Sequence, residues 1–289
     1  MKNFWKDKKI VVTGSEGFVG RHLVTALKSK KAIVTEIPHR LYFEELCNRI
    51  KRQDYVVHLG AQTLVGKAKD NPILTYEANI KGTWEILEAC RLNKTKKIII
   101  ASTDKVYGEG LDKSELCNLG GIYPYDLSKV LCDEMAQRYR IAYDMRIGIT
   151  RCVNIYGPGD TNDSRIIPGT IKSCLKNEDI IIRSNGQTKR SYLYVEDVVE
   201  GYLMFLKSDN DGILNFGIKA VYRTIDIVTI IKKLTKSKSK IKILNISPNE
   251  IFEQSLLYSK AYGVLGWEPK TNLNEGLIKT ILWHKKGWK

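Results

Sequence analysis

The stretch Ile10-Val11-Val12-Thr13-Gly14-Ser15-Glu16-Gly17-Phe18-Val19-Gly20 decides the fold of this chain. Its apolar start predicts a buried strand, and residues 18–27 predict a helix with one apolar face. The three glycines permit a tight turn and a close approach of the backbone to a pyrophosphate, while the helix start offers free N–H groups to phosphate. The stretch therefore predicts a dinucleotide-binding loop, although its spacing is G-x-x-G-x-x-G and not the usual G-x-G-x-x-G.

The alternation of strand and helix continues through the first half of the chain. Apolar runs, often β-branched, predict strands at 33–34, 54–59, 97–101 and 148–152. Longer amphipathic stretches predict helices at 43–52, 73–92 and 125–140. Apolar strands that alternate with helices indicate a parallel sheet covered on both faces. We therefore expect an α/β chain with a Rossmann-type, doubly wound parallel sheet.

The pattern loosens after residue 156, where loops rich in Gly, Pro, Asn and Asp separate helices predicted at 168–176, 195–207 and 224–235. We expect residues 1–155 to form the NAD-binding Rossmann domain, with a return of the chain to its sheet around 191–217. Residues 156–190 and 218–289 are expected to form a smaller α/β substrate-binding region.

Composition limits the class of protein. The 289 residues carry 47 Lys and Arg against 32 Asp and Glu, a formal net charge of +15. No aromatic residue interleaves with the densest basic run, 232–242, so a base-stacking surface for nucleic acid is not expected. No apolar run reaches the roughly 18 residues that cross a bilayer. Six scattered cysteines without a Cys-x-x-Cys pair argue against zinc and disulfides. We expect a cytoplasmic protein without a metal, nucleic-acid or membrane partner.

One acidic residue near the end of the second predicted strand is the candidate ligand of an adenosine ribose. Dinucleotide-binding folds commonly place an acid there for NAD, or an arginine where the ribose carries a phosphate. Glu36 stands slightly early for the first role, and Arg40 follows closely enough for the second. NAD is the expected cofactor, and NADP is not excluded.

Two further groups of residues predict chemistry. Tyr125 and Lys129 stand four apart at a predicted helix start, on one face. A nearby ammonium lowers the pKa of a tyrosine, and so does a positively charged nicotinamide, because both favour the phenolate. Such a tyrosine takes a proton from an alcohol more easily. Two surface side chains are the simpler interpretation of this spacing alone. Thr103, Asp104 and Lys105 follow the fourth predicted strand, at the sheet edge where ligands bind in open α/β folds.

The order of the motifs along the chain resembles one enzyme family. The motifs are Gly14-x-x-Gly17-x-x-Gly20, His58-Leu-Gly-Ala-Gln62, Asn79-x-x-Gly82-Thr83, Ser102-Thr-Asp-Lys-Val-Tyr-Gly108, Tyr125-x-x-x-Lys129, Arg151-Cys-Val-Asn154, Arg165-Ile-Ile-Pro168, Arg190-Ser-Tyr-Leu-Tyr194 and Leu265-Gly-Trp267. Together they resemble the extended short-chain dehydrogenases/reductases that act on nucleotide sugars, over nearly the whole chain.

This resemblance implies a set of binding residues. The implied NAD ligands are Gly14, Glu16, Gly17, Phe18, Val19, Gly20, Glu36, Leu59, Ala61, Asn79, Tyr125 and Lys129. The implied contacts to a nucleoside-diphosphate sugar are Gln62, Asn154, Arg165, Ile166, Arg183 and Arg190. The guanidinium groups of Arg183 and Arg190 suit a diphosphate, and a place on the surface suits each equally well.

The resemblance also implies a homodimer, because helices 80–92 and 125–140 correspond to those that pair in relatives. The apolar residues of these helices could face either a partner or the core of their own chain; they are Ile86, Leu87, Val130, Leu131 and Met135.

Asp104-Lys105 after the threonine resembles the 4,6-dehydratases, and above all those acting on CDP-glucose. The implied reaction begins when Tyr125 takes the proton of the sugar 4-hydroxyl, supported by Thr103 and Lys129. Lys105 then removes the C5 proton and Asp104 protonates the departing 6-hydroxyl. The alternative functions are a nucleotide-sugar 4-epimerase or 4-oxidoreductase and, below these, a non-catalytic Rossmann binding protein. For the Asp104-Lys105 motif itself, the simpler interpretation is a salt pair that caps a turn.

Two departures from the family pattern leave the ligand open. The segment between the second and third predicted strands is short and lacks the usual loop on the adenine side. The stretch Arg190-Ser191-Tyr192 is nearer to enzymes of dTDP- and GDP-sugars. The nucleotide base and the sugar are therefore not predicted.

Overall fold

The computed structural model describes residues 3–247 and 251–287. Its helices are α1 (Phe18–Ser29), α2 (Phe43–Ile50), α3 (Val65–Asp70), α4 (Pro72–Tyr76), α5 (Gly82–Leu92), α6 (Pro124–Ala142), α7 (Ile166–Lys176), α8 (Val195–Lys207), α9 (Thr224–Thr235), α10 (Ser259–Leu265) and α11 (Leu273–Gly287). A π-helical turn, η1 (Glu77–Lys81), joins α4 to α5, and a 3₁₀ turn, η2 (Asp104–Tyr107), follows β4.

The strands are β1 (Lys9–Thr13), β2 (Ile33–Ile37), β3 (Tyr55–His58), β4 (Lys97–Thr103), β5 (Gly110–Lys113), β6 (Ile147–Cys152), β7 (Asn154–Tyr156), β8 (Ile180–Ile182), β9 (Lys189–Arg190), β10 (Tyr192–Tyr194), β11 (Gly212–Phe216), β12 (Tyr222–Arg223), β13 (Ile241–Ile243) and β14 (Glu253–Leu256).

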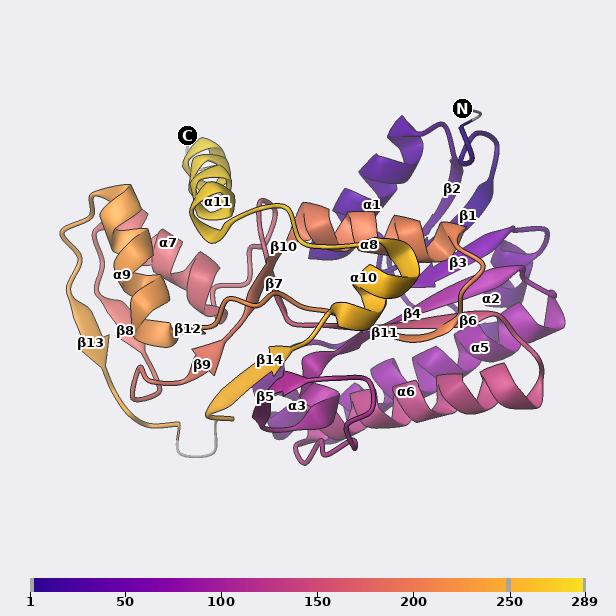
Figure 1. Ribbon diagram of the computed structural model, residues 1–289, viewed down its shortest axis with the longest axis horizontal. Coiled ribbons are helices and arrows are strands. Elements are labelled where there is room, and N and C mark those ends of the chain that lie inside the picture. The colour runs from indigo at the N-terminus through magenta and orange to yellow at the C-terminus, as the bar shows by residue number, and fades with distance from the viewer. Residues whose placement is uncertain (1–2, 248–250, 288–289) are drawn as a thin grey trace.

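Six parallel strands form the central sheet, in the order β11-β6-β4-β3-β1-β2 (Figure 1). From the neighbours β1 and β3, the order continues through β2 on one side and through β4, β6 and β11 on the other. This is the doubly wound arrangement that the sequence predicts. Apolar strands such as Ile10-Val11-Val12 are wholly buried, as both faces of the sheet are covered. The last strand, β11, lies beside β6, so the chain comes back to this sheet after α8.

Each face of the sheet has its own core. Helices α1 and α8 cover one face, and α2, α5 and α6 cover the other. Ile86 and Leu87 of α5 are buried in the second core, so they face their own chain and not a partner. Val130 and Met135 of α6 pack partly against the cores, whereas Leu131 is 42% exposed.

A second region packs at the carboxyl end of the sheet. Helices α7, α9 and α11 surround a separate apolar core that includes Ile171, Ile227 and Leu277, beside the parallel strand pair β8–β13 (Figure 1). The pair β7–β10 leads from the central sheet into this region. Within the described residues no helix has the length and apolar character to cross a membrane.

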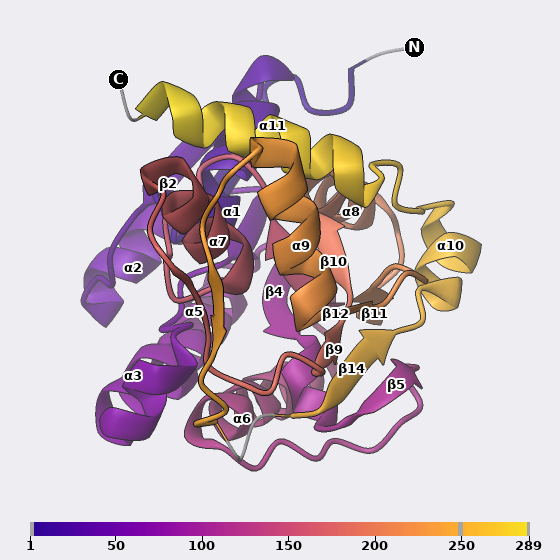
Figure 2. The ribbon, with the colours of Figure 1, turned by 90° about the vertical axis from the view of Figure 1, so that its left-hand side faces the viewer.

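A small four-stranded sheet, ordered β12-β9-β14-β5, joins distant parts of the chain. Figure 2 shows β5 and β14 side by side, with Gln254 opposite Gly110 in the register. Strand β5 follows the end of β4 by only a few residues. A segment near residue 254 therefore lies next to the edge of the central sheet where ligands bind.

Candidate active site

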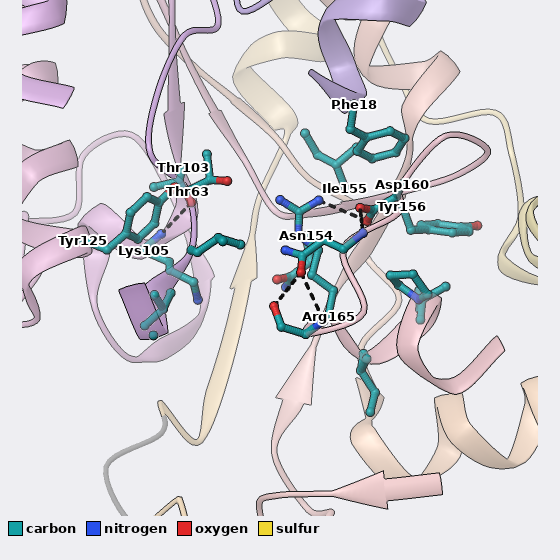
Figure 3. A pocket seen from close by; sticks show the side chains of 18 of the residues that line it. Phe18, Thr63, Thr103, Lys105, Tyr125, Asn154, Ile155, Tyr156, Asp160 and Arg165 are labelled. Carbon is teal, nitrogen blue, oxygen red and sulfur yellow. Dashed lines mark hydrogen bonds and ion pairs between the residues drawn. The ribbon is translucent and has the colours of Figure 1, made fainter. Parts of the chain in front are cut away.

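A cavity of about 1450 Å³ lies between the carboxyl ends of the central strands and the second region. Figure 3 shows Thr103, Lys105 and Tyr125 on one side of it, and Asn154 and Arg165 on the other. Residues of the glycine loop also line the cavity. This position is the one at which open α/β sheets bind their ligands.

The glycine loop forms a tight turn at the cavity. Gly14 has a φ of +63°, and a Cβ there would lie 2.8 Å from the backbone nitrogen of Gly60. Gly17 N donates to Gly14 O at 3.0 Å, which starts α1 at once after the turn. Gly14, Gly17 and Gly20 line the cavity together with Phe18 and Val19. The close approach of backbone and the free helix start make a cradle that fits a dinucleotide diphosphate.

Of the other implied cofactor ligands, Leu59 and Ala61 line the cavity, but Asn79 does not. Asn79 is buried, accepts from Gln62 N at 2.7 Å and donates to Gln62 O at 3.0 Å and to Ser128 Oγ at 2.9 Å. It therefore holds the loop after β3 against α6. Gln62, a predicted substrate contact, lines a second cavity of about 380 Å³ instead.

The two acidic candidates for cofactor binding lie elsewhere. Glu36 is ion-paired with Lys28 of α1 at 2.6 Å, and neither Glu36 nor Glu16 lines either cavity. Successive side chains of a strand point to opposite faces of the sheet. A small shift of the acid along β2 is therefore enough to turn Glu36 toward Lys28 of α1 and away from the cavity. Arg40 lines the second cavity, and Glu85 holds its guanidinium with Nε–Oε2 and Nη2–Oε1 distances of 3.1 and 3.0 Å.

Tyr125 and Lys129 of α6 are each only 7% exposed, so the interpretation as two surface side chains is wrong. Lys129 Nζ donates to Ala101 O at 3.0 Å, and burial lowers the pKa of Lys129. The pKa of Tyr125 is raised by burial and further by the carboxylates of Asp104 and Asp126. Arg165 acts in the other direction, and desolvation outweighs it.

The residues that follow β4 make an acid and a base next to each other. Thr103 Oγ1 donates to Asp104 Oδ1 at 3.0 Å and accepts from Lys105 N at 3.4 Å. Asp104 is 2% exposed, and its Oδ2 has no hydrogen-bond partner among the described residues. Burial raises the pKa of Asp104, although Lys105 opposes the shift. The Lys105 ammonium donates to Gln254 Oε1 at 3.3 Å and not to Asp104, so a turn-capping salt pair does not describe the motif.

The opposite side of the cavity presents polar side chains from loops. Asn154 Nδ2 donates to Ser191 O at 3.3 Å, and Arg165 Nη1 is 3.0 Å from Asp160 Oδ2. Arg165 and its neighbour Ile166 both line the cavity at the start of α7. The predicted substrate contacts on this side are therefore brought together.

The two other arginines differ in environment. Arg183 is exposed, lines the cavity and donates to Ser164 O at 2.8 Å. Arg190 also lines the cavity but is 7% exposed, and it donates to the carbonyls of Lys189 at 2.8 Å and Phe252 at 3.1 Å. A surface position is therefore wrong for Arg190, whose guanidinium ties β9 to the segment before β14.

Sequence reasoning missed two residues, Asp126, which lines the cavity, and Gln254, which contacts Asp104 and Lys105 from behind them. Asp126 is 2% exposed with an unpartnered Oδ1, and burial raises the pKa of Asp126 to about 6. Its place in the first turn of α6 was the available signal, but it reads as an ordinary helix cap. Gln254 is wholly buried beside Asp104 and Lys105. It had no signal, because its strand meets β5 from far along the chain.

Known proteins resemble this chain in sequence and in structure over nearly its whole length. Over 96% of its length the chain is 28% identical to UDP-glucuronic acid decarboxylase 6 of Arabidopsis thaliana, covering 88% of that protein. Over 97% of its length it is 28% identical to human dTDP-D-glucose 4,6-dehydratase, covering 91%. The structure matches UDP-glucose 4-epimerase of Thermotoga maritima with a TM-score of 0.93 and 25% identity, over 97% of this chain and 99% of that one.

A family model fits the region that contains the glycine loop, Thr103 to Lys105 and the Tyr125–Lys129 pair. It matches residues 10–217, well over half of the chain. The chain belongs to the NAD dependent epimerase/dehydratase family.

Proposed function

We propose that this chain is a nucleotide-sugar 4,6-dehydratase that uses NAD and forms a 4-keto-6-deoxy sugar nucleotide. The observation that carries the proposal is Asp104, a buried carboxyl with an unpartnered oxygen at the cavity and a raised pKa. Such a group keeps its proton near neutral pH more readily than an exposed aspartate and can donate it to a departing hydroxyl.

The cradle of Gly14, Gly17 and Gly20 fits the cofactor that the family name implies. When bound, NAD supplies the oxidation at C4 and the later reduction at C6. Leu59, Ala61 and Val19 would lie along it, since they line the same cavity. The protein's own part is to hold the sugar and to move protons.

The first proton step belongs to α6. Tyr125 takes the proton of the 4-hydroxyl, with Lys129 and Thr103 beside the same oxygen. An ionised Asp104 raises the pKa of Tyr125, so a protonated Asp104 leaves the tyrosine closer to the form that accepts a proton. The acid needed for water loss thus assists the base needed for oxidation.

The elimination belongs to η2. Lys105 removes the C5 proton, which the 4-ketone makes acidic, and Asp104 gives its proton to the 6-hydroxyl, which leaves as water. After reduction at C6, Lys105 returns its proton to C5. The proton gained by Tyr125 balances the one that Asp104 has lost. Neighbouring residues suit this step because the hydrogen and the hydroxyl leave adjacent carbons.

The same pair of carboxyls bears on the other reactions of the family. A 4-epimerase needs no acid for a leaving hydroxyl. A decarboxylase binds a sugar whose C6 is a carboxylate, and Asp104 and Asp126, both buried and each with an unpartnered oxygen, would repel it whenever they are ionised. This favours a sugar with a neutral 6-hydroxyl.

The test is incubation with the glucose conjugates of UDP, dTDP, CDP and GDP and with UDP-glucuronic acid, followed by mass spectrometry. Loss of one water supports the proposal; loss of carbon dioxide or an epimer of unchanged mass overturns it. Asp104→Asn should stop water loss yet still show reduced cofactor by absorbance. An Asp104→Asn variant that forms the 4-keto-6-deoxy product at the normal rate would contradict the proposed role of Asp104 and with it the 4,6-dehydratase assignment. Asp209→Asn, a change at a fully exposed carboxylate, is the control.

We also propose that two copies pair through α5 and α6. Trp84 is 51%, Leu127 37% and Leu131 42% exposed on these helices, so each could be covered by a second copy. Light scattering should report a dimer for the unaltered chain and a monomer for Leu131→Glu. A cytoplasmic location stays a prediction.

A further inference from the structure

One side chain from the far end of the sequence supports the acid and base of the site. Gln254, in β14, is 0% exposed. Its Nε2 donates to Asp104 O at 3.1 Å and to Gly108 O at 3.0 Å, the two ends of the η2 turn. Its Oε1 accepts from Lys105 Nζ at 3.3 Å. A single amide therefore spans the turn and reaches the side chain at its centre.

The hydrogen bonds fix which way this amide faces. Carbonyl oxygens only accept, so the NH₂ group must face Asp104 O and Gly108 O. The Oε1 atom must then face the Lys105 ammonium, which only donates. These three contacts alone determine the orientation of the Gln254 amide. Through it, the η2 backbone and the Lys105 side chain are held in a fixed position relative to each other.

The group that accepts the hydrogen bond from Lys105, the Gln254 amide oxygen, carries no net charge. A carboxylate at this distance would stabilise the ammonium and hold its proton, whereas an amide oxygen binds it without adding a charge. The charged groups that interact around this point are Asp104, Asp126 of α6 and Arg190 of β9. A carboxylate added at position 254 would place a new charge next to the Lys105 ammonium, whereas the glutamine amide binds the ammonium without one.

We propose that Gln254 is a positioning residue for the elimination step. It holds Lys105 Nζ at the cavity and keeps the lysine's acceptor uncharged, so that Lys105 can serve as the base at C5. This inference rests on the proposed function, since it concerns the base of that reaction.

Two variants separate this role from mere support of the turn. Gln254→Glu and Gln254→Met have nearly the volume of glutamine, and both lose the NH₂ group that binds Asp104 O and Gly108 O. Both variants therefore lose the donor that supports the turn. They differ at Lys105, where the first adds a carboxylate and the second removes the acceptor, and at the carbonyls of Asp104 and Gly108, which a carboxylate repels and a thioether does not. The unfolding free energy of each variant measures the effect on the turn separately from the effect on Lys105. Gln187→Glu, at an exposed residue, controls for the added charge.

The first measurement needs no substrate. Lysines of the full chain are dimethylated with ¹³C-formaldehyde, and the Lys105 signal is assigned by its absence in Lys105→Arg. Its NMR titration midpoint should rise by about one pH unit in Gln254→Glu and fall in Gln254→Met. Midpoints that stay put, or that move in the same direction in both variants, overturn the proposal. If Gln254→Glu does not fold, a fall in Gln254→Met supports the proposal and an unchanged midpoint overturns it.

The second measurement is the pH profile of kcat with dTDP-glucose and UDP-glucose as probes. In Gln254→Glu the acid limb should move up by about one pH unit, which lowers kcat at pH 7 about tenfold while KM changes less than twofold. An unmoved acid limb with a normal kcat contradicts the proposal. If the unaltered chain converts neither sugar nor the others of the panel, the proposed function fails, and the Lys105 titration still decides whether Gln254 sets the state of this lysine.

Discussion

The two sides of the cavity differ in how far water reaches them. One side, the catalytic wall, consists of Thr103, Asp104, Lys105, Tyr125 and Lys129. Its members Asp104, Tyr125 and Lys129 are less than 10% exposed and have pKa values displaced by burial. The other side, the substrate wall, consists of Asn154, Arg165, Ile166 and Arg183. The Arg165 side chain is 39% exposed, and Arg183 is exposed.

This difference separates chemistry from binding. The buried groups are held in place by the fold, as Lys129 is by its hydrogen bond to Ala101 O. Exposed arginines already have partners, Asp160 and Ser164 O, and a diphosphate would have to compete with these and with water. We therefore expect changes in the catalytic wall to alter rate or stability, and changes in the substrate wall to alter affinity.

The largest effect is expected for Tyr125→Phe. Loss of the proton acceptor for the 4-hydroxyl should lower kcat about 10³-fold, or about 4 kcal/mol, with KM nearly unchanged. Steady-state kinetics measure this, and circular dichroism serves as the check on folding. A variant that instead raised KM and kept kcat would place Tyr125 among binding residues and erase the contrast between the walls.

Behind the catalytic wall lies a buried ion pair whose loss should cost stability. Arg151 Nε and Nη2 are each 2.8 Å from the carboxylate of Asp133, which also accepts from Ser102 Oγ at 2.9 Å. The Arg151 and Asp133 side chains are 2% and 0% exposed. Asp133→Asn leaves a buried guanidinium without its counter-charge, so the free energy of unfolding should fall by about 3 kcal/mol in urea titrations. Asp209→Asn should change it by less than about 0.5 kcal/mol.

Asp126 tests whether burial governs the charges of this wall. Its folded pKa of about 6 lies above the ordinary value of 3.8, so the folded chain holds this proton more tightly than the unfolded chain. Stability from this group is present below pH 4 and is lost as pH rises through about 6. Asp126→Asn should therefore match the unaltered chain near pH 4 and exceed its stability by about 1–2 kcal/mol near pH 8. Equal stability at both pH values would mean that water reaches this carboxyl.

The smallest effect is expected on the substrate wall. Arg165→Ala removes one exposed guanidinium, so KM for a nucleotide sugar should rise about five- to tenfold, roughly 1 kcal/mol, with kcat within twofold. Initial rates over a range of substrate concentrations give both constants. A drop in kcat with constant KM would show that this wall acts in the transition state and not in binding.

Local patterns predicted the central sheet because each strand and helix there carries its own signal. The helices at 195–207 and 224–235 have the predicted bounds, and the sheet edge brings Thr103, Tyr125 and Lys129 together. Side-chain direction was harder, as a shift of one residue along β2 turns Glu36 to the far face, where Lys28 holds it.

The burial and the hydrogen-bond partners of the site residues were harder to predict from the sequence than their positions in the fold. Burial raises the pKa of Tyr125, and nothing in the motif reveals how deep the side chain lies. Asn79 serves the loop at Gln62 and not the cavity, since its amide is satisfied by backbone and by Ser128. Contacts such as that of Gln254 depend on strands brought together by the whole fold.

The pairing of β14 with β5 has a consequence for the order in which the protein is made. Gln254 meets Asp104 across 150 residues of chain. On a ribosome, the glycine loop, the central sheet and the Tyr125–Lys129 pair all emerge well before β14 does. A nascent chain would thus hold its chemical groups early and gain the support of the turn beside them only once β14 has been made, so reactivity would begin after the cofactor-binding part has had time to fold.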